Sequence, residues 1–352
     1  MDKKNIYNVL LIFGGGGTEH EVSAVSAKYI EESFSENEKY NLISVEMLKD
    51  KSFKTKDERY CVEFLEHKRV AIYQKDSMDR TYGDDNKTGP QIIEVDAVIP
   101  CIHGYPGETG DIQSFLDIKN IPFFGCSSES SKICFNKINT KIWLNHLNIP
   151  NTPFLFLEDL NELNVKLATN FFLQNENFVF VKSSNQGSSV GCYPIRHLED
   201  LESAIRNAFE YSPFVLIEKG VAGRELEISV YEYHGSIHAS RPGEIICPSN
   251  FYSYDEKYSP HSQTKTVTLA ENVEERIVKL MKEYSITVFK KLKLKHLSRI
   301  DFFLGKDNQI YLNEINTFPG LTPISMFPKM MEENGHSFKN YIVSSIDALL
   351  NL

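Results

Sequence analysis

Apolar and polar positions along the first third of the chain form alternating blocks that predict strands and helices in turn. Continuous apolar runs predict buried strands in NVLLIF, YNLISVEML, VDAVIPCIHG and NIPFFG. Between them, Val22, Val25 and Ile30 recur at helical spacing in a segment that begins at about Glu21, and DIQSFLDI predicts a short helix. Strands that are apolar throughout are typical of sheets covered on both faces. We therefore predict an α/β domain with a Rossmann-like, mainly parallel sheet.

The remaining two thirds order their strands and helices differently, which predicts two α+β units. A helix from about Glu129 to Leu147 leads into the strand FVFVK, the amphipathic helix LEDLESAIRNAFEY and the strand PFVLIEKG. The last part combines the strands RELEISVYEY, SIHAS, LSRIDFFLG and QIYLNEIN with a long helix after Val273 and a terminal helix that carries Phe338 and Ile342. The domains that we predict are residues 1–126, 127–217 and 218–352.

A hydrophilic stretch from about Asp50 to Pro90 interrupts the first domain and predicts an exposed loop, KDSMDRTYGDDNKTGP. The net charge of −10 argues against general nucleic-acid binding. No apolar run reaches the roughly 18 residues of a membrane span. Six scattered cysteines lack a Cys-x-x-Cys pair, so we expect reduced thiols in a cytoplasmic protein, without zinc or disulfides. His234 and His238 lie on a predicted strand, too far apart to share a metal.

The stretch LLIFGGGGTEHEVS joins the first predicted strand to the first predicted helix through four glycines. A dinucleotide fingerprint needs glycine at the first, third and sixth positions of its loop, and the sixth position here is Glu19 or His20. Thr18 and Glu21 fit a capping box that would open the helix. Glu19 then has two interpretations: an acid favoured by the helix dipole, or a carboxylate that faces a cationic group of a small substrate.

The stretch RIDFFLGKDNQIYLNEINTFPG predicts two apolar strands joined by the turn KDNQ. Residues two apart on a strand share a face, so Arg299 lies beside Asp301, and Glu314 beside Asn316. A hairpin can then bring three oxygen ligands, Asp301, Glu314 and Asn316, around one point. Hard oxygen donors suit Mg²⁺ held beside phosphates, and Arg299 could neutralise phosphate charge. The alternative interpretation is a solvated polar face.

Other stretches are weaker candidates for a nucleotide or substrate site. FVFVKSSNQGSSVG places Lys182 at the end of a buried strand, before a Gly-bounded serine turn that can cover phosphates. Glu218 ends another strand and Glu225 follows a short loop, so these acids could meet adenine and ribose. Lys137 is most simply a surface lysine on a helix. His103 lies at the carboxyl end of a strand, the usual ligand edge of an open α/β sheet.

Seven stretches, taken in chain order, resemble the D-alanine–D-alanine ligase family of the ATP-grasp fold. They are GGGGTEHEVS, HGYPGETGDIQ, VKSSNQGSSVG, LIEKGVAGRELE, FYSYDEKY, SRIDFF and NEINTFPGLTPISMFP, and they are distributed along nearly the whole chain, from Gly14 to Pro328. The resemblance implies a Rossmann-like domain followed by two α+β units that clasp ATP. It implies that ATP phosphorylates the carboxylate of one D-alanine and that the amine of a second displaces phosphate, which feeds peptidoglycan synthesis. A homodimer is also implied.

The resemblance further implies a role for each matching residue. Glu19 would hold the ammonium of the first D-alanine with His103 nearby, and Ser188 and Tyr258 would close over the site towards Glu19. The implied groups for the second step are Arg299 and the Gly320 N–H at the oxyanion, and Ser325 and the Met326 N–H at the second carboxylate.

For the nucleotide, the implied phosphate ligands are Lys137, Lys182 and Lys257. Adenine and ribose would meet Glu218, Lys219, Val221 and Glu225, with Lys219 and Val221 acting through their backbone. The implied ligands of Mg²⁺ or Mn²⁺, with two ions expected, are Asp301, Glu314 and Asn316.

This sequence departs from the family pattern at two positions. Ser183 follows Lys182 where proline is usual, and Asn136 precedes Lys137 where aspartate is usual. The acceptor also stays open, because D-serine, D-lactate or another amino acid could replace the second D-alanine. A non-catalytic nucleotide-binding relative is the alternative from another class, but it would not need the full set of Arg299, two carboxylates and an amide. The neutral Tyr258 phenol favours an amine acceptor, since a cationic imidazolium there would repel an ammonium.

Overall fold

The first domain of this computed structural model, which describes residues 6–74, 90–247 and 264–352, is built on a seven-stranded sheet. At its centre β1 (Tyr7–Gly14) pairs in parallel with β2 (Tyr40–Met47) and β7 (Ala97–Cys101). Alternate residues of β1 enter two separate cores, one beneath α1 (His20–Phe34) and one beneath α2 (Asp111–Ile118). This explains why β1 is apolar throughout, and the predicted parallel core is confirmed.

The hydrophilic stretch Asp50–Pro90 contains strands for which the sequence analysis predicted none. Residues 53–74 form three short strands that extend the sheet by antiparallel pairing, and a fourth follows at 91–94. Their bounds are β3 Phe53–Thr55, β4 Tyr60–Phe64, β5 Arg69–Gln74 and β6 Gln91–Glu94. Val62, Phe64 and Val70 bury apolar side chains among polar neighbours, a half-buried pattern that average hydrophilicity conceals. The exposed loop predicted from KDSMDRTYGDDNKTGP falls on residues 75–90, of which 75–89 lie outside the described residues.

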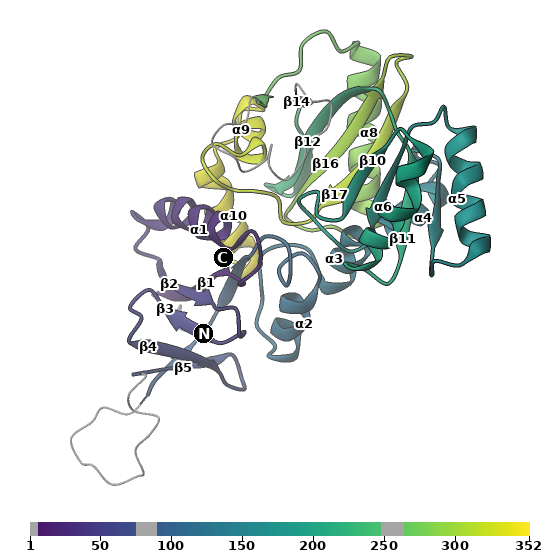
Figure 1. The fold of residues 1–352 in the computed structure, drawn as a ribbon. Coiled ribbons are helices and arrows are strands. Elements are labelled where there is room, and N and C mark those ends of the chain that lie inside the picture. Colours follow the sequence, from purple (N-terminus) through teal and green to yellow (C-terminus); the bar gives the residue numbers. More distant parts are fainter. Residues whose placement is uncertain (1–5, 75–89, 248–263) are drawn as a thin grey trace.

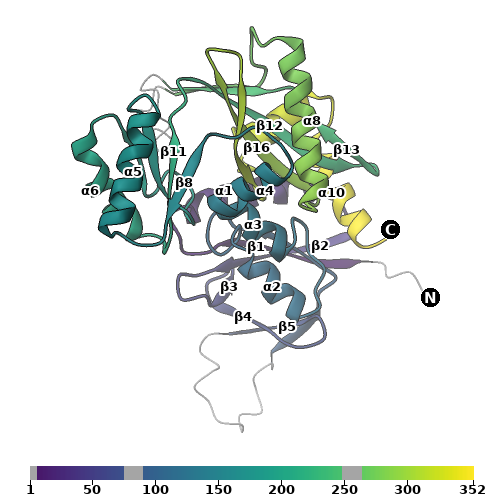
Figure 2. The ribbon, with the colours of Figure 1, turned by 90° about the vertical axis from the view of Figure 1, so that its right-hand side faces the viewer.

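The second sheet has four antiparallel strands in the order β10-β9-β11-β8. One face packs against two helices, and Figure 2 shows them together on the outer side of the sheet. The strands are β8 Phe154–Leu157, β9 Val179–Ser183, β10 Cys192–Ile195 and β11 Val215–Lys219; the helices are α5 Glu162–Gln174 and α6 Leu201–Phe209, the latter preceded by the 3-10 turn η2 Leu198–Asp200. The opposite face carries Phe180, Lys182, Leu216 and Glu218 at alternate positions of neighbouring strands.

The third sheet is antiparallel and contains the predicted hairpin. Its main path is β15-β14-β12-β16-β17, and β13 pairs with β12. The strands are β12 Gly223–Tyr233, β13 Ser236–Ala239, β14 Gly243–Ile246, β15 Lys265–Val267, β16 Leu297–Gly305 and β17 Ile310–Asn316. Residues 306–309 form the turn between β16 and β17, as predicted from KDNQ. The helix α8 (Glu275–Lys291) shares a core with β12 and β16, where it buries Ile277 and Met281.

The helix predicted from Glu129 to Leu147 is two helices, α3 (Ser128–Phe135) and α4 (Lys137–His146). Asn136 separates them in an extended conformation, and its side chain accepts a hydrogen bond from the Asn139 N–H. Asparagine is a strong helix N-cap, so a new helix starts at Lys137. Cys134 and Leu144, which belong to the second predicted domain, pack in the core of the third sheet. The division into three domains therefore stays a prediction.

The C-terminal helix returns to the first domain. Figure 1 shows α10 (Phe338–Leu349) beside α1, while α9 (Met326–Glu333) lies nearer the third sheet. Phe338, Ile342 and Ile346 share one core with Leu11 and Ile30. The Asp347 carboxylate accepts hydrogen bonds from the Lys39 ammonium and the Tyr40 hydroxyl. One face of the first sheet is therefore completed by the end of the chain.

All six cysteines are free thiols. Burial raises the pKa of Cys101 and Cys126, and that of Cys126 rises to about 12, so these are inert core residues as predicted. Within the three described ranges, none of the helices has the length and apolar character needed to cross a membrane.

Candidate active site

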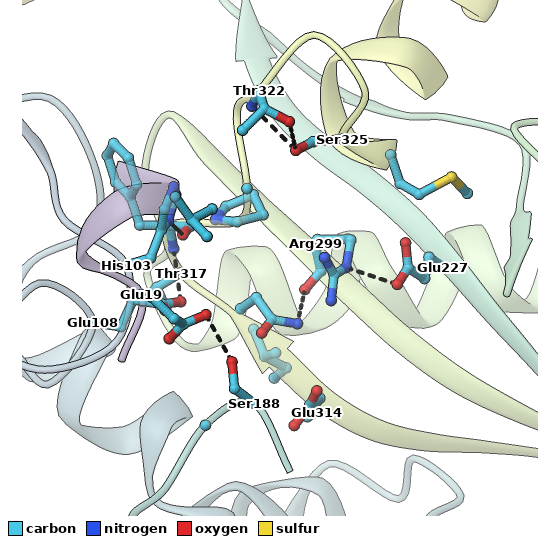
Figure 3. A pocket seen from close by; sticks show the side chains of 18 of the residues that line it. Glu19, His103, Glu108, Ser188, Glu227, Arg299, Glu314, Thr317, Thr322 and Ser325 are labelled. Atoms are coloured by element: carbon cyan, nitrogen blue, oxygen red, sulfur yellow. Dashed lines mark hydrogen bonds and ion pairs between the residues drawn. The ribbon is translucent and has the colours of Figure 1, made fainter. Parts of the chain in front are cut away.

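Two adjoining cavities, of about 810 and 560 Å³, form one cleft where the three sheets meet. The first is lined by the Gly-rich stretch, the HGYPGETG stretch and residues 316–326. The second is lined by β9, the loop before β12, and β16. Lys137, Ser188, Arg299 and Glu314 line both cavities, so they stand where the two parts join. Figure 3 shows the first cavity from close by.

Glu19 stands at the start of α1 and faces the first cavity. The capping box predicted for Thr18 and Glu21 is wrong, because α1 begins at His20 and Glu19 is its N-cap residue, without a side-chain capping bond. Instead the Glu19 carboxylate accepts a hydrogen bond of 2.7 Å from the Ser188 hydroxyl (Figure 3). The predicted contact between Ser188 and Glu19 is therefore present, and the carboxylate is directed across the cleft rather than back to its own helix.

Two glycines near Glu19 occupy positions where a side chain would collide with neighbouring atoms. Gly16 has a φ of +72°, and a Cβ there would lie 2.4 Å from the Cα of Lys49. Gly104 has a φ of +65°, and a Cβ there would lie 2.7 Å from the Glu19 carboxylate. Only glycine adopts these conformations without strain or a clash. The opening stretch thus brings a carboxylate into the cleft, which supports the second interpretation of Glu19.

His103 is buried behind Glu19 and joins two walls of the first cavity. Its Nδ1 lies 3.2 Å from the Phe318 carbonyl oxygen, which can only accept, so Nδ1 carries the proton. Its Nε2 then accepts from the Ser26 hydroxyl at 2.8 Å. Burial lowers the pKa of His103, although the nearby Glu19 opposes this. A neutral imidazole therefore ties α1 to the segment that precedes α9.

Glu108 is a cavity residue that the sequence analysis missed, although it lies in HGYPGETG. Its carboxyl accepts hydrogen bonds from the backbone N–H groups of Gly104 and Phe318, at 2.9 and 3.4 Å. Burial and then the charge of Glu19 raise the pKa of Glu108 to about 8. Of the two neighbouring acids, Glu108 is thus the one held neutral near pH 7. The charge of Glu19 is the one available to a cation.

The β16–β17 hairpin aligns the predicted polar residues on one face. Arg299 is the register partner of Asn316, and Asp301 that of Glu314, with an irregularity after Asp301. The Arg299 guanidinium donates twice to the Asp301 carboxylate, at 2.8 and 2.7 Å. It also lies 3.3 Å from the Glu227 carboxylate, a contact shown in Figure 3. Burial alone would lower the pKa of Arg299, but Asp301 and Glu227 outweigh it and raise the pKa. Glu227, to which the sequence analysis gave no role, fixes the guanidinium from the neighbouring strand.

The donor set on this hairpin fits a hard divalent cation. Asp301 and Glu314 bring two carboxylates face to face, and the Asn316 amide lies 2.9 Å from Asp301. Among the described residues no three His, Cys, Asp or Glu side chains are grouped for a metal, so the amide is needed as the third donor. The solvated-face alternative does not fit, because Asp301 lines the cleft with only 13% of its side chain exposed.

Lys137 and the loop after β9 meet at the junction of the two cavities. The Lys137 N–H donates to the Ser184 carbonyl at 2.9 Å, and its ammonium donates to the Gln186 carbonyl. The same ammonium lies 3.9 Å from the Glu314 carboxylate. Lys137 is therefore a cleft residue, and the surface-lysine interpretation is wrong. The sequence feature that could have indicated this is Asn136, a helix N-cap residue that places Lys137 at the start of α4.

Ser183 shows what replaces the usual proline. Its N–H donates to the Gly191 carbonyl at 2.9 Å, and its hydroxyl donates to the Val190 carbonyl at 3.1 Å. Proline offers neither donor. These two bonds close the loop that carries Ser188 into the cleft, so the departure adds hydrogen bonds at the base of the loop.

The acids predicted for adenine and ribose are placed differently from one another. Glu225 and Val221 line the second cavity. Glu218 does not line it: its carboxylate is buried and bonds Lys141, Lys182 and Thr152. Lys219 also lies away from it, with its N–H donated to the Pro153 carbonyl and its ammonium to Glu176. The sequence placed Glu218 at a strand end but could not show which way its side chain turns.

The remaining predicted residues lie at the start of α9. Gly320, Ser325 and Met326 line the first cavity, and Ser325 is the N-cap residue of α9. The Ser325 hydroxyl accepts from the Thr322 N–H at 3.1 Å, which folds the 320–325 turn over the cavity (Figure 3). Free N–H groups at a helix start favour a carboxylate. Lys257 and Tyr258 lie outside the described residues.

Comparisons with known proteins agree with this geometry. Residues 8–126 match the family model described as D-ala D-ala ligase N-terminus, and residues 143–347 match D-ala D-ala ligase C-terminus. A protein of Shewanella piezotolerans named D-alanine--D-alanine ligase is 47% identical over 342 residues, covering 97% of this chain and 98% of the relative. A protein of the same name from Shewanella woodyi is 48% identical, covering 97% and 98%.

Among solved structures, D-alanyl-alanine synthetase A from Vibrio cholerae superposes with a TM-score of 0.89 at 43% identity, covering 99% of this chain and 100% of that chain. The VanG D-Ala:D-Ser ligase from Enterococcus faecalis superposes with a TM-score of 0.82 at 26% identity, covering 98% and 99%. Family models and relatives thus span both halves of the cleft. The chain belongs to the D-alanine–D-alanine ligase family, with its ATP-grasp fold.

Proposed function

We propose that this protein joins two D-alanine molecules at the expense of ATP, and so supplies D-alanyl-D-alanine for peptidoglycan precursors. The observation that carries the proposal is one continuous cleft with an acid at one end, lysines at the other, and Arg299 with Glu314 between them. An oxygen of the first carboxylate attacks the γ-phosphorus of ATP, and ADP leaves. The amine of the second D-alanine attacks the acyl carbon, loses a proton and expels inorganic phosphate.

The first D-alanine is assigned to the Glu19 end of the cleft. Its ammonium pairs with the Glu19 carboxylate, which Ser188 orients at 2.7 Å. Glu108 stays protonated beside it, because its pKa is raised to about 8. A single charge therefore meets a single ammonium. His103, neutral and bonded to Ser26, acts as a support for this wall and not as a proton carrier.

The ATP phosphates are assigned to the lysine end. Lys137 and Lys182 supply positive charge, with Val221 and Glu225 towards the nucleoside. Asp301, Glu314 and Asn316 would hold Mg²⁺ or Mn²⁺, with two ions expected from the family. When bound, the metal would offset phosphate charge and orient the γ-phosphoryl group. Lys257, in the FYSYDEKY stretch, is a further phosphate ligand by resemblance alone.

The second step is assigned to the junction of the cavities. Arg299, fixed by Glu227, and the Gly320 N–H stabilise the oxyanion that forms when the amine adds to the acyl carbon. The start of α9, with Ser325 and the Met326 N–H, seats the second carboxylate. D-alanine is favoured over D-serine as acceptor because the curated relatives that share 46–48% of residues are named for D-alanine, whereas the D-Ala:D-Ser ligase shares 26%.

The test is release of phosphate from ATP with D-alanine, D-serine or D-lactate as added substrate. D-Alanine alone should give phosphate and dipeptide in equal amounts. ATP hydrolysis that does not respond to D-alanine would overturn the proposal in favour of a nucleotide-binding relative. Efficient ester formation with D-lactate would overturn the amine acceptor. The homodimer, proposed from the family alone, is tested by light scattering during size-exclusion chromatography.

A further inference from the structure

A buried cluster of charge lies behind Lys182, outside the contacts used above. The Glu218 carboxylate accepts from Lys182 through Oε1 and from Lys141 through Oε2, the latter at 2.8 Å. The Thr152 hydroxyl donates to the same Oε2 at 2.9 Å and accepts from the Lys141 ammonium at 2.7 Å. Lys141 and Glu218 are 1% and 2% exposed, so water does not screen these charges.

Two cations share this single carboxylate. Burial alone would raise the pKa of Glu218, but Lys141 and Lys182 outweigh it and hold the pKa well below its ordinary value. Burial lowers the pKa of Lys141, with Glu218 opposing, and Glu218 also overcomes burial to raise the pKa of Lys182. Glu218 therefore stays ionised. One lysine would be enough to neutralise it, and two are paired with it.

The two lysines differ in where they stand. Lys182 is at the end of β9 and lines the second cavity, on the face that it shares with Glu218. Lys141 comes from α4, one turn after the cleft residue Lys137, and does not line either cavity. It is also held by the Thr152 carbonyl at 3.2 Å and lies 5.2 Å from the centre of the Phe154 ring. One lysine can reach a ligand, and the other is fixed.

We propose that Lys141 is a positioning residue that keeps Glu218 neutralised and so frees Lys182 to turn towards the phosphates of ATP. This inference rests on the proposed function, because it needs phosphate in the second cavity. Without Lys141, Lys182 would be the sole counter-charge of a buried carboxylate. Moving Lys182 to a phosphate would then strand that carboxylate, which is among the costliest states in a protein interior. With Lys141 present, Glu218 keeps a partner throughout.

The test compares the affinities of ATP and adenosine for the metal-free protein, measured by titration calorimetry and competition. Lys141→Met should weaken ATP binding about tenfold or more and leave adenosine binding unchanged. Lys141→Arg, which keeps the charge, should restore ATP affinity to within about threefold. Lys166→Met, an exposed lysine on α5, is the matched control and should change neither affinity.

Equal losses of ATP and adenosine affinity would mean that Lys141 only maintains the shape of the pocket, and would overturn the inference. So would unchanged ATP binding, or an arginine variant as weak as the methionine variant. If Lys141→Met does not fold, Thr152→Val decides, because it removes the hydroxyl that holds Lys141 and Glu218 together beside their direct ion pair, and it should weaken ATP binding selectively. A wild-type protein that binds adenosine but not ATP would instead refute the proposed nucleotide site.

Discussion

The two ends of the cleft hold their charges in opposite ways. At the Glu19 end a single carboxylate faces the cavity and is oriented by a neutral hydroxyl, while its acidic neighbour Glu108 is held protonated. At the Lys182 end the charges are buried in ion pairs, with Glu218 between two lysines. A small ammonium can be met by one exposed carboxylate. A highly charged phosphate chain requires cations. Before the ligand binds, buried cations need an ion pair with an acidic side chain.

Glu314 stands where the two arrangements meet, so its removal should have the largest effect. Glu314→Gln keeps the size of the side chain but removes the carboxylate charge opposite Asp301. We expect turnover to fall by about a hundredfold or more, because the site for the divalent cation loses a ligand. Turnover is measured by phosphate release across a range of Mg²⁺ concentrations.

Tyr311→Phe, on the same strand with its hydroxyl donated to Gln309, is the control for Glu314→Gln and should retain turnover. A Glu314→Gln enzyme that is near normal at ordinary Mg²⁺ would show that the hairpin does not hold the metal.

Glu19→Gln separates the two ends by acting on one of them. Loss of the charged hydrogen bond to an ammonium costs about 1.5–3 kcal/mol, which is about tenfold to a hundredfold in affinity. The KM for the first D-alanine should therefore rise by that factor while the KM for ATP stays the same. Glu32→Gln, an exposed residue further along α1, provides the comparison. Equal changes in both KM values would contradict a role confined to the amino-acid end.

Asn136 caps the helix that begins at the cleft residue Lys137, so substituting it should change the free energy of unfolding. Asn136→Ala removes the cap of α4 and should lower the free energy of unfolding by about 1 kcal/mol. Asn136→Asp, the residue usual in the family, keeps the cap and should leave stability unchanged. Urea denaturation of both variants measures this. Equal destabilisation by Ala and Asp would mean that the hydrogen bond from the Asn136 side-chain amide to Asn185 contributes more to stability than the cap does.

The effect of Glu108 should appear as a pH dependence of stability. Its pKa rises from 4.5 to about 8 on folding, so the folded state binds more protons than the unfolded state between these values. The free energy of unfolding should therefore fall as pH rises through this window. Glu108→Gln lacks this contribution, so its stability relative to wild type should improve from about pH 5 to about pH 9. A constant difference across that range would show that Glu108 ionises normally.

The sequence predicted the position of a functional residue where the secondary structure alone determines which way its side chain faces. Arg299, Asp301, Glu314 and Asn316 align because strands alternate, and the turn KDNQ fixed the hairpin. Glu19 was found because glycines surround it. In each case the position of the backbone decides which side the side chain faces.

Residues whose role depends on packing between distant segments were not predictable. Glu218 was placed at the right strand end, but the lysine of α4 that turns its carboxylate inward lies far away in sequence. Glu108 and Glu227 became cavity residues only when the first and third sheets met. The strands at 53–74 were hidden because only alternate positions are buried, and short half-polar strands resemble loops by average composition.

The packing of α10 against α1 has a consequence for how the chain is made. The core that α1 forms on the Val9 and Leu11 face of β1 is completed by Phe338, Ile342 and Ile346, which are synthesised about 300 residues later. A nascent fragment that ends at residue 126 has α1 on this face but lacks the apolar side chains of α10 that complete the core. Synthesis therefore leaves part of this core exposed to aggregation until α10 is made, and loss of α10 would damage the domain furthest from it in sequence.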